Sequence, residues 1–316
     1  MRRCPKPERR PTTSAGFTLV EIAVVIVVLS LLLAMIAGIA TAMVGQQRRE
    51  VTRQKLAGVE TALALFVSQN KRLPCPADGR MAAADVDAGL ERPGVAGACQ
   101  VVTGTANSQT HGVVPWRTLG LAESDVTDGW GNRLTYRAAP ELTLANAMDL
   151  TACDPAGADA GVLVVIGGVN QYYCNTACST TTFPAACTPP SAFARNKGLK
   201  VRNLLATVTL VMDPTANPSP TGAAYVVISH GENGVGSYSS AGVLQAGTVG
   251  SGTLEAANNA ADVTFNHGSS MGLANANAFV DDFAVYAEGT GHFDDFVLRP
   301  SILTLATKAQ LGPRAH

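Results

Sequence analysis

Six side chains in the last third of the chain are of the types that bind metal ions or transfer protons in enzymes. Their spacing does not form an HExxH metal motif, and the chain has no phosphate-binding glycine loop that ends in a lysine. The histidines among them lie in glycine-rich sequence, where hydrogen bonding or solvent contact is the commoner role. We therefore predict that the protein is not an enzyme. The alternative is a hydrolase that uses residues from this set, which comprises His230, Glu232, His267, Asp281, Asp282 and His292.

A single glutamate interrupts the longest apolar segment of the chain. Glu21 is the only charged residue between Phe17 and Val44, and a helix of this length would extend about 42 Å, enough to cross a bilayer. A carboxylate inside a membrane costs roughly 2.5 to 3.5 kcal/mol on insertion scales and normally marks a partner or a function. Cleavage between Gly16 and Phe17 would create an α-amino group one helical turn from Glu21. That amine, from the same chain or a neighbour, could pair with the carboxylate.

The charges on the two sides of this segment differ in sign. Residues 1–16 hold five of the 23 basic residues and one of the 24 acidic residues, which leaves 18 basic and 23 acidic residues in the rest of the chain. Basic residues before an apolar span keep that end in the cytoplasm, so the part after the span is exported. The exported part has no dense run of Lys and Arg, which weighs against nucleic-acid binding as its main task.

Cysteine usage agrees with export. Cys4 precedes the apolar segment and the other six cysteines follow it, in a compartment that permits disulfides. Their spacing lacks the paired CxxC of a zinc ribbon. Six cysteines allow 15 connectivities, of which sequence proximity favours those that pair Cys75 with Cys99. We predict three disulfides among Cys75, Cys99, Cys153, Cys174, Cys178 and Cys187.

The six residues at positions 16–21, GFTLVE, together with the basic leader and the apolar run, resemble the class III prepilin signature of type IV pilins and type II secretion pseudopilins. The resemblance implies that prepilin peptidase cleaves after Gly16 and methylates the new N-terminal Phe17. It further implies that Glu21 neutralises the Phe17 amine of a neighbouring subunit in a filament. The implied partners are other pilin or pseudopilin subunits, prepilin peptidase and an inner-membrane assembly platform.

Three later clusters are similar to the globular domain of the major pseudopilin. They are TDGWGNRLTY at 127–136, with Gly129 in place of the usual proline, SHGENG at 229–234, and VDDF at 280–283. In that family the loop and the later aspartates hold calcium, a hard cation that requires oxygen ligands. Asn233 stands where the family has an acidic ligand, which lowers the expected affinity. The resemblance thus implies a calcium site of Glu232, Asn233, Asp281 and Asp282, whereas a glycine turn and a solvated strand start remain the alternative.

The elements that must position these residues follow from the pattern of apolar side chains. Leu56, Val59, Leu63 and Phe66 recur at intervals of three and four, which predicts an amphipathic helix over 46–73 that ends before Pro74. Residues 77–112 read as loop, and residues 197–213 are ambiguous between helix and strand. Apolar runs rich in β-branched residues predict strands at 112–116, 133–139, 161–167, 223–229 and 279–287.

Together these features predict an α+β, pilin-like fold in which a long N-terminal helix packs on an antiparallel sheet. We expect a removed cytoplasmic leader at 1–16, a transmembrane and assembly helix at 17–45, and a periplasmic globular domain at 46–316, β-rich with long loops from residue 74. The predicted protein spans the inner membrane once. The expected function is a structural subunit of a type II secretion pseudopilus; a minor type IV pilin for adhesion, motility or DNA uptake stays open, and a membrane-anchored periplasmic hydrolase is the weaker alternative.

Overall fold

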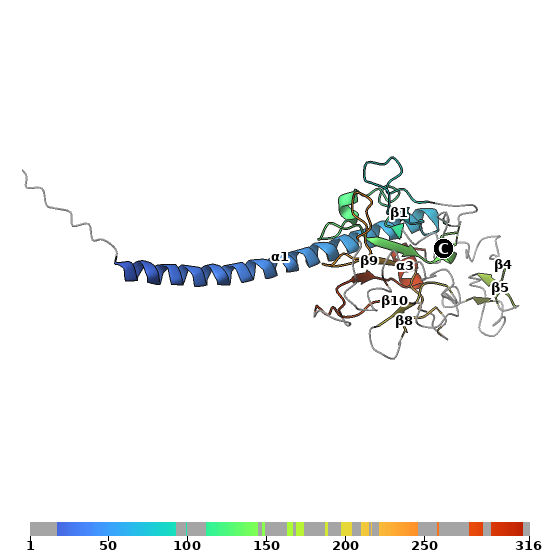
Figure 1. The fold of residues 1–316 in the computed structure, drawn as a ribbon. Helices are drawn as coiled ribbons and strands as arrows, with labels where there is room; N and C mark the ends of the chain where they lie inside the picture. Colours follow the sequence, from blue (N-terminus) through green and yellow to red (C-terminus); the bar gives the residue numbers. More distant parts are fainter. Residues whose placement is uncertain are drawn as a thin grey trace, which may run out of the picture. The chain divides into compact units, whose positions relative to one another are not determined.

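The chain divides by its internal contacts into two compact units, residues 1–47 and residues 48–316. Figure 1 shows the ribbon of the computed structural model. The structure describes residues 18–92, 99, 112–144, 147–148, 163–166, 169–173, 187–188, 197–203, 210–214, 216, 221–245, 258, 278–286 and 292–311.

The first unit contains the beginning of helix α1 (Leu19–Asn70). Every described side chain from Thr18 to Ile36 is exposed. In the part of the chain that the structure describes, α1 is the one helix long and apolar enough to cross a membrane, through Leu19–Ile36. Such a segment near the N-terminus serves as a membrane anchor or as a signal sequence.

The later residues of α1 belong to the second unit and carry an apolar stripe. Leu56, Val59, Leu63 and Val67 are buried, and their spacing of three and four keeps them on one side of the helix. The predicted amphipathic helix is therefore confirmed, and it ends at Asn70, three residues earlier than predicted. Lys71 follows with φ 54°, a left-handed conformation typical of helix ends.

The stripe packs into the same core as a five-stranded antiparallel sheet. The strand order is β1 (Ala77–Asp78), β2 (Gly112–Val113), β3 (Thr135–Ala138), β9 (Tyr225–Ser229) and β11 (Phe296–Leu298). In the central pair, Tyr136 lies opposite Val227. Every residue of β3 and β9 is buried; β9 is a mainly apolar run, whereas β3 also buries Thr135 and Arg137.

The described residues also form two three-stranded sheets. One has the order β10 (Phe279–Val280), β7 (Val201–Arg202), β8 (Leu210–Met212), and the other has the order β4 (Leu163–Ile166), β5 (Val169–Tyr173), β6 (Cys187–Thr188). The ambiguous segment 197–213 therefore contains two short strands. The predicted strands at 112–116, 133–139, 161–167 and 223–229 contain β2, β3, β4 and β9, whereas the one at 279–287 shortens to β10.

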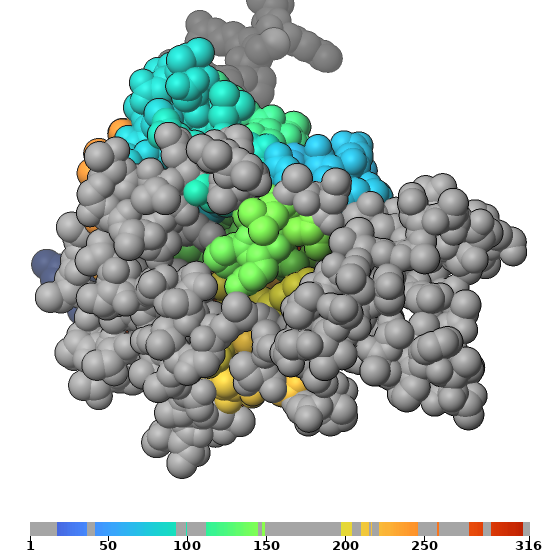
Figure 2. Space-filling model, turned by 90° about the vertical axis from the view of Figure 1, so that its right-hand side faces the viewer, coloured from blue at the N-terminus to red at the C-terminus, as the bar shows by residue number. Residues whose placement is uncertain are grey.

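Three short helices were not expected. The 3-10 helices η2 (Glu123–Val126) and η3 (Pro140–Leu142) flank β3, and α3 (Ile302–Lys308) follows β11. Leu73 N donates to Leu142 O, so the chain leaving α1 is bonded to η3. Figure 2 shows the blue end of α1 beside the green segment that contains η3. The general prediction of an α+β protein with antiparallel sheet is confirmed.

Candidate functional site

Glu21 lies in the first turn of α1 and bonds to the residue that precedes the helix. Glu21 Oε2 accepts hydrogen bonds from Thr18 N at 2.8 Å and Thr18 Oγ1 at 2.9 Å, and Glu21 N donates to Thr18 Oγ1 at 3.3 Å. This is a capping box, in which Thr18 and Glu21 satisfy each other's backbone donors. The T-x-x-E spacing was present in the sequence and could have revealed it. Gly16 and Phe17 lie outside the described residues.

The turn after η2 is hydrogen-bonded to the later part of α1. Gly129 N donates to Thr52 Oγ1 at 3.0 Å, and Lys55 Nζ donates to Thr127 O at 2.5 Å. A Cβ on Gly129 would lie 2.3 Å from Arg48 O, so the turn approaches the helix backbone too closely for a side chain. The contact explains why this position holds glycine, because proline would lose the N–H and clash with the helix.

Asp128 joins this turn to the SHGENG loop. Its Oδ1 accepts from Trp130 N and Asn132 N, both at 2.9 Å, and its Oδ2 accepts from Ser229 Oγ at 2.8 Å. The side chain is almost fully buried, and this burial raises the pKa of Asp128, against the hydrogen bonds, which lower it. Two of the three clusters in the sequence therefore meet at Asp128 and Ser229.

The carboxylate found against the SHGENG loop belongs to Asp294. Asp294 Oδ2 accepts from Glu232 N at 2.7 Å, and a Cβ on Gly231 would lie 2.4 Å from the Asp294 carboxyl carbon. Gly231 has φ 59°, so both its conformation and this close approach require glycine. Asp294 belongs to a second Asp-Asp-Phe sequence, residues 294–296, that our sequence reasoning did not single out.

Asp281 and Asp282 lie instead along a groove beside α1. Asp281 Oδ2 accepts from Arg299 Nε at 2.5 Å, and both aspartates line the groove together with Arg53 and Glu60 of α1. Among the described residues, no group of three or more Asp, Glu, His or Cys side chains could hold a metal ion. The calcium site of Glu232, Asn233, Asp281 and Asp282 therefore stays a prediction.

His230 follows Ser229 and lies in the interior of the second unit. Its Nε2 is hydrogen-bonded to Thr135 Oγ1 at 2.9 Å, and its Nδ1 lies 3.8 Å from Asp295 Oδ1. Burial, followed by the nearby Arg137, lowers the pKa of His230 to about 3, so the imidazole is neutral and the contact with Asp295 is not an ion pair. Thr135, His230 and Asp295 have the residue types of a nucleophile, base and acid, but all three are buried.

Of the other histidines considered for catalysis, His292 Nε2 lies 3.8 Å from Asp294 Oδ1, and His267 lies outside the described residues. The sequence also contains a G-x-S-x-G motif, the pattern of some serine hydrolases, at residues 268–272, which lie outside the described residues too. Of these residues, Thr135, His230 and Asp295 are buried together, whereas Glu232 is exposed and Asp281 and Asp282 line the groove beside α1.

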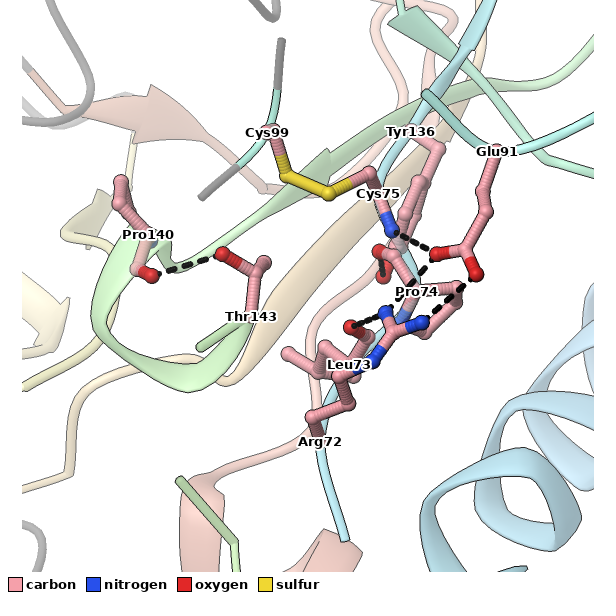
Figure 3. The surroundings of a disulfide bond; sticks show 9 residues. All are labelled: Arg72, Leu73, Pro74, Cys75, Glu91, Cys99, Tyr136, Pro140 and Thr143. Carbon is pink, nitrogen blue, oxygen red and sulfur yellow. Dashed lines mark hydrogen bonds and ion pairs between the residues drawn. A yellow bond between two sulfur atoms is a disulfide. The ribbon is translucent and has the colours of Figure 1, made fainter. Parts of the chain in front are cut away.

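One disulfide closes the segment after α1. Cys75 is bonded to Cys99 with 5.4 Å between their Cα atoms, as sequence proximity favoured. Figure 3 shows the Arg72 guanidinium facing the Glu91 carboxylate beside Cys75. Glu91 accepts from Arg72 Nη1 at 2.8 Å, from Arg72 Nη2 at 2.7 Å and from Cys75 N at 3.0 Å. Cys187 lies in β6, and Cys153, Cys174 and Cys178 lie outside the described residues.

Comparison of the chain with protein-family models, curated proteins and solved structures finds no match in any of the three.

Proposed function

We propose that this chain is a structural subunit of a type II secretion pseudopilus, cleaved by prepilin peptidase after Gly16 and assembled through α1. The observation that carries the proposal is the GFTLVE sequence, whose last three residues begin α1. The first residues of that helix are apolar and exposed, and its later residues pack on an antiparallel sheet. A single-pass inner-membrane protein with its globular unit in the periplasm fits the basic leader.

The capping box suggests how Glu21 is accommodated before assembly. Both hydrogen bonds from Thr18 use Glu21 Oε2, and no described residue donates to Oε1. A carboxylate that is half satisfied within its own chain costs less in the membrane and retains one oxygen for a partner. In the filament that partner is the amine of Phe17 on a neighbouring subunit, which gives a charge-assisted hydrogen bond.

A minor type IV pilin is the second candidate because it would share the same processing signal. The contact between Asp128 and Ser229 favours the pseudopilin, since it brings together two clusters that resemble the major pseudopilin. The weakly acidic exported part gives little support to DNA uptake. The assembly genes that the subunit requires would separate the two candidates.

The first test is mass spectrometry of the protein extracted from its native membrane. The expected mature chain begins at Phe17 and is heavier by one methyl group. An uncut chain, or one cut after the apolar segment, would contradict the proposal and favour a membrane-anchored or secreted protein of another kind.

The second test separates processing from assembly. Glu21→Ala should be cleaved normally but enter filaments poorly, because the membrane-embedded amine loses its partner. Glu50→Ala is the matched control, since Glu50 is an exposed carboxylate on the same helix, outside the apolar segment. Normal incorporation of Glu21→Ala would rule out the pairing mechanism while leaving the processing result intact.

A further inference from the structure

Residues 283–286, which we name the Phe283 segment, form an exposed apolar surface on the second unit. Phe283 is 89% exposed, Val285 39% and Tyr286 46%, and Ala284 between them is exposed too. The segment is held in place, since Val285 N donates to Phe293 O at 2.7 Å and Phe293 N donates to Val285 O at 2.9 Å. Single exposed apolar residues are ordinary, but a fixed and contiguous group that includes an almost fully exposed phenylalanine indicates an interaction surface.

This surface lies against the first residues of α1 that belong to the second unit. The guanidinium of Arg49 lies 4.1 Å from the centre of the Tyr286 ring, and that of Arg53 lies 5.5 Å from the centre of the Phe296 ring. Phe283, Tyr286 and Phe296 line the same groove. An arginine that lies over an aromatic ring combines an apolar body with polar tips, a combination suited to the boundary between lipid and water.

The place of Arg49 in the sequence indicates what the Phe283 segment meets. Arg49 follows Val44, the last residue of the apolar run, by five residues, and five residues of chain extend at most about 18 Å. When the apolar run lies in the membrane, as the proposed function requires, chain length alone keeps Arg49 and the Tyr286 ring over it close to the lipid headgroups. The nearest large partner for the exposed segment is therefore the bilayer itself.

We propose that the Phe283 segment inserts its side chains into the headgroup region of the phospholipid bilayer that holds α1, before the subunit enters a filament. The apolar side chains reach the boundary of the acyl chains, while the Arg49 guanidinium stays among the phosphates. The inference rests on the proposed membrane anchorage of α1 and adds a second membrane contact, made by the globular unit. Because α1 already links the unit to the membrane, the second contact forms within one molecule and needs little intrinsic affinity.

Net charge does not select this partner, because the acidic and basic groups near the segment largely balance. Glu50 lies 3.8 Å from Arg53, and Asp281 binds Arg299. Asp282 has a partner as well. The bilayer is favoured instead by the exposed apolar side chains and by their short separation along the chain from the apolar run. The contact should therefore form on zwitterionic lipid, without a requirement for anionic headgroups.

The test places a photoreactive benzoyl-phenylalanine at position 283 of the full chain, which is purified and reconstituted in phosphatidylcholine vesicles. Irradiation should give a phospholipid adduct at this position, identified by mass spectrometry of the digested protein. Crosslinks from position 283 to a second copy of the chain in place of lipid would overturn the proposal and favour a contact between subunits. Absence of any adduct at this position would overturn it too.

Leu144 carries the control probe, near the other end of the helix. Its side chain is 43% exposed, and Leu142 O, two residues earlier, accepts from Leu73 N just after α1. From Arg49 to its last residue, α1 extends about 32 Å. The probe at Leu144 should therefore yield little lipid adduct. Equal adduct yields at the two positions would overturn the proposal.

A second variant separates insertion of the ring from mere proximity to lipid. Because the Phe283 side chain is 89% exposed, Phe283→Ser should leave the unit folded. With a small diazirine probe at position 284, this variant should lower the yield of lipid adduct about tenfold, the factor for a phenylalanine that loses its burial. Leu144→Ser removes an exposed side chain elsewhere and should leave that yield unchanged. An unchanged yield in Phe283→Ser would refute the insertion.

A benzoyl-phenylalanine at Leu33, in the apolar segment, reports membrane anchorage separately. Lipid adducts from Leu33 without lipid adducts from position 283 would refute only the contact of the Phe283 segment. Absence of lipid adducts at both positions would refute this contact and the proposed membrane anchorage together.

Discussion

The hydroxyl of Ser229 donates a hydrogen bond to the Asp128 carboxylate at 2.8 Å, although 101 residues of chain separate them. Asp128 also accepts from two backbone N–H groups of its own turn, so a single buried side chain satisfies three donors. The turn that contacts α1 and the loop that follows β9 are therefore parts of one buried polar unit.

Replacing Asp128 should destabilise the second unit strongly. Asp128→Ala leaves three donors without their acceptor in the interior, and we expect a loss of about 3 kcal/mol in the free energy of unfolding. Ser229→Ala removes one of the bonds and should cost about 1 kcal/mol. Urea unfolding of the full chain in detergent, followed by tryptophan fluorescence, measures both, because Trp130 lies in this turn. Equal unfolding midpoints for Asp128→Ala and the unchanged protein would contradict this account.

His230 should make stability depend on pH. Its pKa is about 3 in the folded chain and about 6.5 in an unfolded one, so the unfolded state binds more protons between these values. The His230 contribution is therefore fully present above pH 6.5 and is lost as the pH falls toward 3. Lowering the pH from 7.5 to 5 should reduce the free energy of unfolding by about 2 kcal/mol through this group.

The His230 effect can be isolated by comparison with a variant. His230→Gln keeps a polar side chain but cannot titrate, so its stability should change less between pH 7.5 and 5 than that of the unchanged protein. A similar pH slope in both proteins would show that His230 is not the group responsible.

Gly129 should tolerate no side chain. Gly129→Ala places a Cβ 2.3 Å from Arg48 O, and we expect a loss of about 2 kcal/mol or more, because backbone must shift. Gly129→Pro should be worse, since it also removes the hydrogen bond to Thr52. Gly58→Ala is the matched control, which should raise stability by up to about 1 kcal/mol. Thermal unfolding of the four proteins gives the comparison.

The Cys75–Cys99 bond should stabilise the exit from α1. It closes a separation of 24 residues, for which the chain-entropy estimate is about 3 kcal/mol. Cys75→Ser, Cys99→Ser and the double variant should lose similar stability, since each removes the same bond. Urea unfolding without reductant provides the measurement. A double variant that is much less stable than both single variants would mean that the cysteines act separately.

The sequence predicted the elements whose inward-facing residues are buried along the whole element. The α1 stripe and strand β9 are buried along their length and mainly apolar, so the apolar pattern identified them. Helix α3 escaped notice because it has only seven residues, too few to show helical periodicity. Its N-cap, Ser301, accepts from Thr304 N and was a weak signal in the sequence.

The sequence could not show that Asp294, rather than Asp281 or Asp282, contacts the SHGENG loop. Two Asp-Asp-Phe segments occur, at 281–283 and 294–296, and local pattern gives no reason to prefer either. The two segments differ in their tertiary contacts. The segment at 294–296 leads directly into β11, which pairs with β9, whereas the segment at 281–283 borders the groove beside α1. The close approach of Gly129 to Arg48 O is likewise a tertiary contact, for which the local sequence gives no signal.

Arg133 is buried in the second unit, and its guanidinium stacks over Trp116. It binds the Glu123 carboxylate and donates to three carbonyl oxygens, those of Gly79, Met81 and Ser240. Segments from distant parts of the chain are thus held at one fixed point. The chain between these contact points can therefore change in length without moving the points themselves, so insertions should be tolerated best in the loops that Arg133 does not touch.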